Sequence, residues 1–277
     1  MTFLRVVEVL PPRFKSRRDL RGAREGLDHF TAGVRDLRGY ADLILVANSK
    51  DQGYYKPDTL QVASGLKRDL RIATAPVVVV RDQNRPQFLS TVLSAFMAGM
   101  KSVMVAWGDD YPGGSASNVR DFRSLAGAIA EAARIREMAG PSASIFAPVN
   151  LNLLSSPTGA SMAKGRIAAG ADLLMAQPPT TDPGDTFTRH LALIDNCDLR
   201  QEVLFNVFPF KDRADVLHYE RIFGWKLPRA LHAAARGGRA PLLGLERDVV
   251  SRIRREGLPG VYISTRGDLG LAREILS

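Results

Sequence analysis

The sequence predicts one (β/α)8 barrel, the TIM barrel, with extra helices before the last strand. Three observations predict this fold. The chain has 277 residues, close to the roughly 250 that such a barrel takes. Short apolar runs alternate with longer amphipathic runs, and no linker divides residues 1–277 into two domains. The apolar runs are rich in Val, Ile and Leu on both faces, as in parallel strands that are covered on both sides.

Eight apolar runs are expected to be the strands of the barrel. They are Leu4–Leu10, Asp42–Ala47, Pro76–Val80, Ser102–Ala106, Ala143–Ala147, Ala171–Ala176, Glu202–Phe208 and Gly260–Ser264. The main alternative is an open, doubly wound sheet, whose first turn often carries a Gly-rich phosphate loop. Here the first turn reads Leu10-Pro11-Pro12-Arg13, which favours the closed barrel.

The segments between the runs have the pattern of helices. The clearest are Pro86–Ala98, Asn118–Met138, Pro157–Ala169 and Lys211–Arg255. Gly99 and Gly170 follow the first and third of these, where glycine commonly ends a helix. The fourth is long enough for two or three helices, which are the extra helices of the predicted fold.

The charge of the chain favours an anionic partner. Lys and Arg number 38 and Asp and Glu 29, so the formal net charge is +9. A phosphorylated cofactor or an anionic small molecule fits this charge. We expect no nucleic-acid partner, because the basic residues are dispersed and no RNA- or DNA-binding motif accompanies them.

Several classes of protein are excluded by composition. The single cysteine, Cys197, rules out a disulfide framework and a multi-cysteine metal site, and the four histidines lack metal-ligand spacing. We therefore expect no metal. No apolar run approaches the ~20 residues of a membrane span, and the first residues do not resemble a signal peptide. A cytoplasmic protein without a membrane partner is expected, and homo-oligomerisation is left open.

In a barrel of this kind, chemistry takes place at the carboxyl ends of the strands. Glu8 stands out there, because a buried and unpaired carboxylate costs several kcal/mol to ionise. Its pKa should therefore rise, which would make Glu8 a general acid near neutral pH. The structural alternative is a buried salt bridge, for example with Arg81.

Other polar residues follow the later strands. Asp109 comes after Gly108, which allows a sharp turn, and its alternative role is a turn or helix cap. The side-chain amide of Gln177 can read the donor and acceptor edge of a heterocycle, or brace a loop. Further polar residues at strand ends are candidate substrate-binding groups: Asp82, Asn84 and Asn206.

Five segments together resemble the methylenetetrahydrofolate reductase family, in the same order and over nearly the whole chain. They are Val7-Glu8-Val9-Leu10-Pro11-Pro12, Arg81-Asp82-Gln83-Asn84-Arg85, Ala98–Gly108 with Asp109, Ala169-Gly170-Ala171-Asp172 with Ala176-Gln177-Pro178, and Gly260-Val261-Tyr262. The resemblance implies a barrel enzyme of one-carbon metabolism. That enzyme reduces 5,10-methylene-tetrahydrofolate to 5-methyl-tetrahydrofolate, with NAD(P)H as reductant and FAD as carrier.

The resemblance also implies roles for residues. Glu8 would be the general acid, Asp109 would lie against the pterin ring and tune the flavin site, and Gln177 would hydrogen-bond the pterin. The candidate cofactor-binding residues are Asn48, Trp107, Gly108, Asn150, Lys164 and Arg166.

This sequence departs from the family pattern at the flavin. Trp107 replaces an Arg, and on the helix after strand five only Lys164 and Arg166 could serve the ribose and phosphates. Three interpretations stay open: other contacts to FAD, direct hydride transfer from NAD(P)H, or a different carrier such as tetrahydromethanopterin. The alternative function is a non-redox pterin-binding protein or a partner in corrinoid-dependent methyl transfer.

Overall fold

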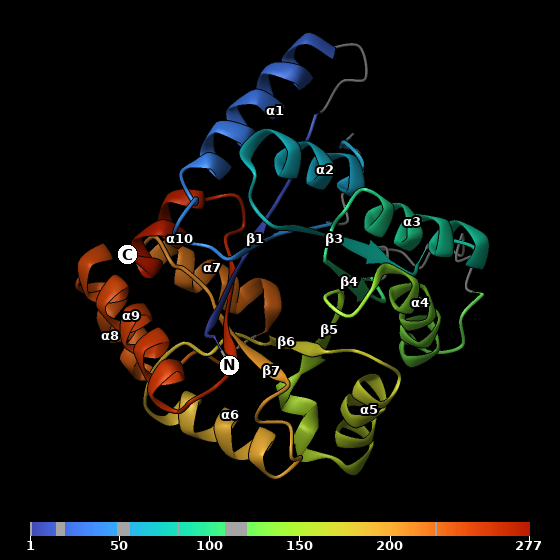
Figure 1. Cartoon of the computed structure of the whole chain (residues 1–277). Helices are drawn as coiled ribbons and strands as arrows, with labels where there is room; N and C mark the ends of the chain where they lie inside the picture. Colours follow the sequence, from blue (N-terminus) through green and yellow to red (C-terminus); the bar gives the residue numbers. More distant parts are fainter. Residues whose placement is uncertain (1, 15–19, 49–55, 82, 109–120, 225) are drawn as a thin grey trace.

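The computed structural model describes residues 2–14, 20–48, 56–81, 83–108, 121–224 and 226–277. Eight parallel strands form a closed barrel in the order β1 to β8, and helices surround it (Figure 1). The predicted TIM barrel is therefore confirmed. The strands are β1 Leu4–Val9, β2 Leu43–Val46, β3 Thr74–Val79, β4 Ser102–Ala106, β5 Ser144–Asn150, β6 Leu173–Gln177, β7 Val203–Val207 and β8 Gly260–Ser264.

Each strand is connected to the next by one or more helices. The helices are α1 Leu20–Arg35, α2 Thr59–Leu70, α3 Arg85–Met97, α4 Leu125–Ala139, α5 Pro157–Ala168, α6 Asp185–Asp195, α7 Arg213–Phe223, α8 Arg229–Arg236, α9 Arg239–Arg255 and α10 Leu269–Leu276, with a 3-10 turn η1 at Leu151–Ser155. The prediction of two or three helices between strands seven and eight is confirmed by α7, α8 and α9.

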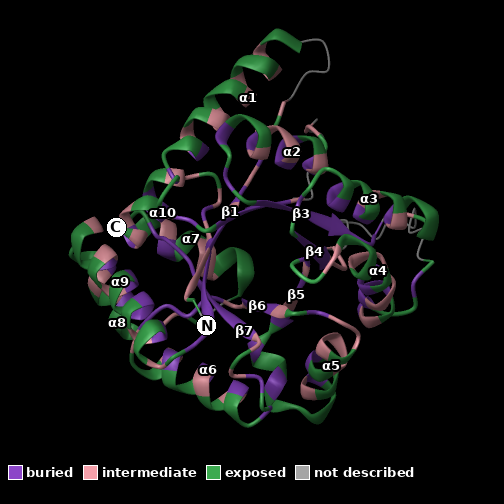
Figure 2. Cartoon of the chain, viewed as in Figure 1, coloured by how far each residue is buried: buried purple, intermediate pink, exposed green. Residues whose placement is uncertain are grey.

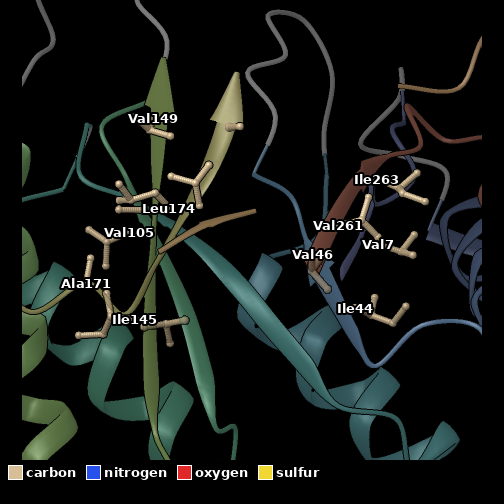
Figure 3. Close-up of a cluster of buried hydrophobic side chains, with 14 of the residues drawn as sticks. Val7, Ile44, Val46, Val105, Ile145, Val149, Ala171, Leu174, Val261 and Ile263 are labelled. Atoms are coloured by element: carbon tan, nitrogen blue, oxygen red, sulfur yellow. The ribbon is translucent and has the colours of Figure 1, made fainter. Parts of the chain in front are cut away.

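Side chains alternate between the inside of the barrel and the layer under the helices, because successive residues of a strand point to opposite faces. Large apolar side chains fill the inside: Val6, Leu43, Leu45, Ala75, Val77, Val79, Met104, Phe146, Met175, Leu204 and Tyr262. A larger cluster packs between sheet and helices, and Figure 3 shows part of it, including Val7, Ile44 and Val261. The barrel is thus a packed core, with room for chemistry only at its ends.

The helix predicted from Asn118 begins later than expected. α4 starts at Leu125, where the side chain of Ser124 accepts a hydrogen bond from the backbone N–H of Gly127. Such a cap satisfies a backbone donor that the first helical turn leaves unpaired. Just before it, Phe122 is buried with its ring edge-on to that of Phe88, at 5.0 Å between centroids. The prediction was therefore wrong at this helix start, for which the serine was the available signal.

The helix α1 differs from the others in its packing. Figure 1 shows it projecting beyond the ring of helices, and most of its surface is exposed in Figure 2. Val34 is its only buried residue, although its amphipathic pattern provides an inward-facing stripe. Within the described residues, no helix combines the length and apolarity that crossing a membrane requires.

Candidate active site

Glu8 lies at the carboxyl end of β1, on the inward side of the barrel. The register of the parallel strands pairs it with Ser264 of β8, and pairs Val6 with Tyr262. One oxygen of Glu8, Oε2, accepts hydrogen bonds from the hydroxyl groups of both Tyr262 and Ser264, the latter at 2.6 Å. The carboxyl group is therefore held in one position at the mouth of the barrel, and Glu8 is only half-buried there.

Burial raises the pKa of Glu8, and the hydrogen bonds from Ser264 and Tyr262 only partly oppose this effect. The rise agrees in direction with the expectation from the sequence. The described structure contains no ion pair between Glu8 and Arg81, so the alternative of a salt bridge with this arginine is wrong. A carboxyl group whose pKa is raised, and that faces the mouth, is suited to donate a proton.

Asn206 of β7 is the second polar group at this end of the barrel. It pairs in register with Tyr262, and none of its surface is exposed. Neither the oxygen nor the nitrogen of its side-chain amide has a hydrogen-bond partner among the described residues. An unsatisfied buried polar group costs roughly 1–3 kcal/mol. A donor and an acceptor without partners thus lie together in register with Tyr262, below the surface that solvent reaches.

Gly108 shapes the mouth at the end of β4. Its φ of +88° lies in the left-handed region, and a Cβ atom there would come within 2.4 Å of Val79 Cγ1. The same Cβ would lie 3.5 Å from Cζ of Arg81, so the arginine side chain crosses directly over the glycine. Arg81 is buried, and its backbone N–H donates to the carbonyl of Trp107 at 3.0 Å. The glycine thus provides the space that the Arg81 side chain occupies.

No family model and no curated protein matches this sequence. Solved structures share the fold. An uncharacterized protein from Clostridium thermocellum, described as binding two copies of 5-methyl-5,6,7,8-tetrahydrofolic acid, superposes with a TM-score of 0.63 at 12% identity, over 100% of this chain and 95% of that one. A phosphonomutase-like protein from Burkholderia cenocepacia J2315 gives 0.51 at 16% identity, over 96% and 89%. At these identities the comparisons show the barrel fold.

Gln177 and Asn150 lie side by side at the ends of β6 and β5, where they are paired in register. Gln177 is half-buried. Asn150 is exposed, and it caps η1, because its side chain accepts a hydrogen bond from the backbone N–H of Asn152. Together with Glu8 and Asn206, these residues place four of the predicted polar groups on the carboxyl ends of strands. Their roles toward a ligand stay predictions.

Two other asparagines that were predicted to bind substrate or cofactor form hydrogen bonds with residues of the chain itself. Asn84 is exposed and caps α3, accepting from the N–H of Gln87 at 2.9 Å. Asn48 accepts from Nζ of Lys56 at 2.6 Å. Asp82 and Asp109 lie outside the described residues.

The side chains of three predicted cofactor-binding residues lie away from the mouth. Trp107 packs against the apolar layer between sheet and helices. Lys164 on α5 lies 3.4 Å from the carboxylate of Asp198, which precedes β7 and so belongs to the opposite end of the barrel. The guanidinium of Arg166 donates to the backbone carbonyl of Pro148, and burial lowers its pKa. Within the described structure these side chains do not form a site for a flavin nucleotide.

Tyr262 and Ser264 are two site residues to which the sequence assigned no role. Both lie on β8, and their contact with Glu8 depends on the pairing of the first strand with the last. The available signal was the spacing of Tyr262 and Ser264, which are two residues apart and so share a strand face. Among the described residues, no cluster of His, Cys, Asp and Glu side chains could hold a metal ion.

Proposed function

We propose that the mouth of the barrel binds the pterin ring of a reduced folate or a related tetrahydropterin, and that the protein reduces its 5,10-methylene form to the 5-methyl form with NAD(P)H. The observation that carries the proposal is the Glu8 carboxyl, held by Tyr262 and Ser264. The unpaired amide of Asn206 supports it, because a pterin ring offers donors and acceptors along one edge. So does the description of the Clostridium thermocellum protein, which shares the fold and binds a methylated tetrahydrofolate.

The proposed chemistry uses one proton and one hydride. The proton of Glu8 passes to N10 of the methylene-bridged substrate, the bond between N10 and the methylene carbon breaks, and an iminium forms at N5. The methylene carbon then accepts a hydride from NAD(P)H, which leaves as NAD(P)+. The product carries a methyl group on N5, and a proton from solvent restores Glu8. A raised pKa suits the first step, because the acid must hold its proton until the substrate is in place.

The described residues favour direct transfer of the hydride over transfer through FAD. Three of the six candidate cofactor-binding residues, Trp107, Lys164 and Arg166, direct their side chains behind the sheet or toward the other end of the barrel. We therefore assign no step to a flavin.

A second candidate is a protein that binds the pterin without a redox step and serves a methyl-transfer partner. The description of the Clostridium thermocellum protein favours this candidate, because it names binding of the methylated folate and no reaction. The two functions share the mouth site, and they differ in whether NAD(P)H is consumed.

Anaerobic turnover separates the two. Protein that has been checked for the absence of flavin absorbance is mixed with 5,10-methylene-tetrahydrofolate and NADH or NADPH, without flavin, and the methyl product is measured. Parallel runs with methylene-tetrahydromethanopterin identify the carrier. We expect product from wild type and a loss of 100-fold or more in Glu8→Gln, with binding of 5-methyl-tetrahydrofolate nearly unchanged by calorimetry. Binding without turnover would support the second candidate, and no binding of either pterin would contradict both.

A further inference from the structure

A cavity of about 970 Å³ lies beside the mouth and is separate from the Glu8 group. It is bounded by α1, by α7 and by the segments that follow β1 and β8. Glu8, Asn206 and Tyr262 are not among the residues that line it. Its size is at the upper end of the range of small-molecule sites.

Aromatic side chains line the α7 side and the α1 side of this cavity. Tyr219 and Phe223 of α7 lie one helical turn apart, with parallel rings whose centroids are 5.7 Å from each other. Phe223 keeps 50% of its surface exposed, although it is a large apolar side chain. Phe30 contributes a further ring from α1. Flat apolar surfaces on two walls are suited to hold a planar ring between them.

The rim of the cavity is positively charged. Its described lining residues include three cationic side chains, Arg13, Lys211 and Arg266, against one carboxylate, Asp268, which pairs with Lys211 at 2.9 Å. Arg13 and Lys211 are both exposed. Asp215 compensates Arg266 from behind the cavity wall, so three cationic groups stand against two carboxylates, and this small positive excess favours an anionic ligand.

The side chain of Arg266 is held by contacts with two aromatic rings, a carboxylate and a backbone carbonyl. Its guanidinium lies 3.6 Å from the ring centroid of Tyr219 and 4.1 Å from that of Phe208. It also contacts the carboxylate of Asp215 at 2.9 Å and the carbonyl of Pro209 at 2.7 Å. The backbone of Arg266 has a φ of +51°, a conformation that costs a non-glycine residue free energy and that is found more often at functional sites. Arg266 therefore holds the Tyr219 side of the cavity in a fixed position, while its own charge is compensated by Asp215.

The face of α1 toward the cavity carries two glycines, Gly26 and Gly33, which let the helix lie close to Phe14 and Leu269. Gly26, His29, Phe30 and Gly33 recur at the spacing of one helix face, and all four line the cavity. Glycine is unfavourable inside a helix by roughly 1 kcal/mol relative to alanine. At Gly33 a Cβ would already lie 3.0 Å from Leu269, so side chains on this face would reduce the space between α1 and the barrel.

We infer that this cavity binds an aromatic carboxylate, with the ring between Phe30 and Phe223 and the carboxylate at Lys211 and Arg13. The inference does not depend on the proposed function, because it uses none of the residues of the Glu8 group. The ligand chemistry could belong to a free aromatic acid or to the acidic arm of a larger ligand whose other end lies in the mouth.

The probe is 4-aminobenzoyl-L-glutamate, titrated into the whole protein by calorimetry, with 4-aminobenzamide as the uncharged match. We expect the glutamate probe to bind at least tenfold more tightly than the amide. Phe223→Ala and Lys211→Gln should each weaken it about tenfold, while Met138→Ala, in the groove between α3 and α4, should leave it unchanged. Phe223 and Lys211 are exposed, so both variants should unfold at the temperature of wild type.

Three results would overturn the inference: no binding of the probe, equal binding of the amide, or binding that survives both variants. A loss in Met138→Ala equal to that in Phe223→Ala would also contradict it. Where the probe binds, a repeat with saturating 5-methyl-tetrahydrofolate identifies the source of the chemistry. If 5-methyl-tetrahydrofolate displaces the probe, the cavity binds the acidic arm of that ligand. If both bind at once, the cavity binds a separate aromatic acid. In Glu8→Gln the probe should bind as in wild type even if that variant, or the wild type, shows no turnover.

Discussion

The Tyr262 hydroxyl donates a hydrogen bond to the Glu8 carboxyl across the seam where β8 meets β1, although 254 positions separate the two residues. The contact exists only when the barrel is closed, because it joins the first strand to the last. The group with the most distinctive chemistry at the mouth is thus positioned by the completion of the fold.

Removing the Tyr262 hydroxyl should raise the pKa of Glu8 further. The hydrogen bonds from Tyr262 and Ser264 stabilise the charged carboxylate and oppose the effect of burial. In Tyr262→Phe one of these donors is lost, and we expect the pKa of Glu8 to rise above that in wild type. The measurement is a pH titration of the 13C-carboxyl resonance of Glu8 by NMR, which does not require activity. Ser264→Ala should move the pKa in the same direction, and a fall in either variant would contradict the assigned hydrogen bonds.

Acid should destabilise the protein through His190. Burial lowers the pKa of His190 to about 4, and its Nδ1 lies 2.8 Å from the hydroxyl of Thr180. The folded state therefore binds this proton less readily than the unfolded state, whose histidine titrates near 6.5. Its contribution to stability is complete above pH 6.5 and is lost as the pH falls toward 4. Between pH 7.5 and 4.5 the loss should be roughly 2–3 kcal/mol.

The measurement for His190 is urea unfolding at both pH values, with His190→Gln as the comparison. The variant keeps a polar group beside Thr180 but has no proton to bind in this range. The free energy of unfolding of wild type should fall relative to that of the variant on acidification. A constant difference between the two proteins would mean that His190 does not titrate as described.

Titration of Glu246 should change the stability in the opposite direction to that of His190, so that stability falls as the pH rises. Burial raises its pKa to about 7, although it accepts from Arg239 at 2.7 Å and from the N–H of Phe210 at 2.8 Å. The folded state therefore binds this proton more readily than the unfolded state. The stability that this provides is complete below about pH 4.5 and is lost as the pH rises through 7. Between pH 6.5 and 8.5, above the range of His190, wild type should lose about 1 kcal/mol relative to Glu246→Gln. A parallel pH dependence in the two proteins would rule this out.

The local sequence pattern was sufficient to predict the barrel and the position of Glu8 at the carboxyl end of the first strand. The strands are apolar on both faces, and a carboxylate or an amide among such residues is conspicuous, as Glu8 and Asn206 show. The partners of Glu8 were not predictable in this way. Tyr262 and Ser264 contact Glu8 because β1 and β8, the strands farthest apart in the sequence, are paired in the barrel. No local pattern specifies the register of that pairing.

The contacts of the predicted asparagine and basic residues could not be read from local sequence, for a different reason. Asn84 and Asn150 stand where helices begin, and an asparagine oxygen can cap a helix as well as it can bind a ligand. Lys164 and Arg166 lie on a helix that follows a site strand, but the rotation of α5 turns them to Asp198 and to the back of β5. Which face of a helix reaches a site depends on tertiary packing.

Gly108 offers a direct test of the packing at the mouth. Gly108 and Gly39 share a φ of +88°, in the left-handed region, where alanine carries a backbone cost of roughly 1–2 kcal/mol. At Gly39 a Cβ meets nothing within 4 Å, whereas at Gly108 it meets Val79 at 2.4 Å and Arg81 at 3.3 Å. Overpacking adds roughly 1–3 kcal/mol, so Gly108→Ala should lower the free energy of unfolding by that much more than Gly39→Ala. Chemical denaturation of the two variants measures the difference. Equal losses would mean that the close approach of Arg81 to Gly108 does not exist in solution.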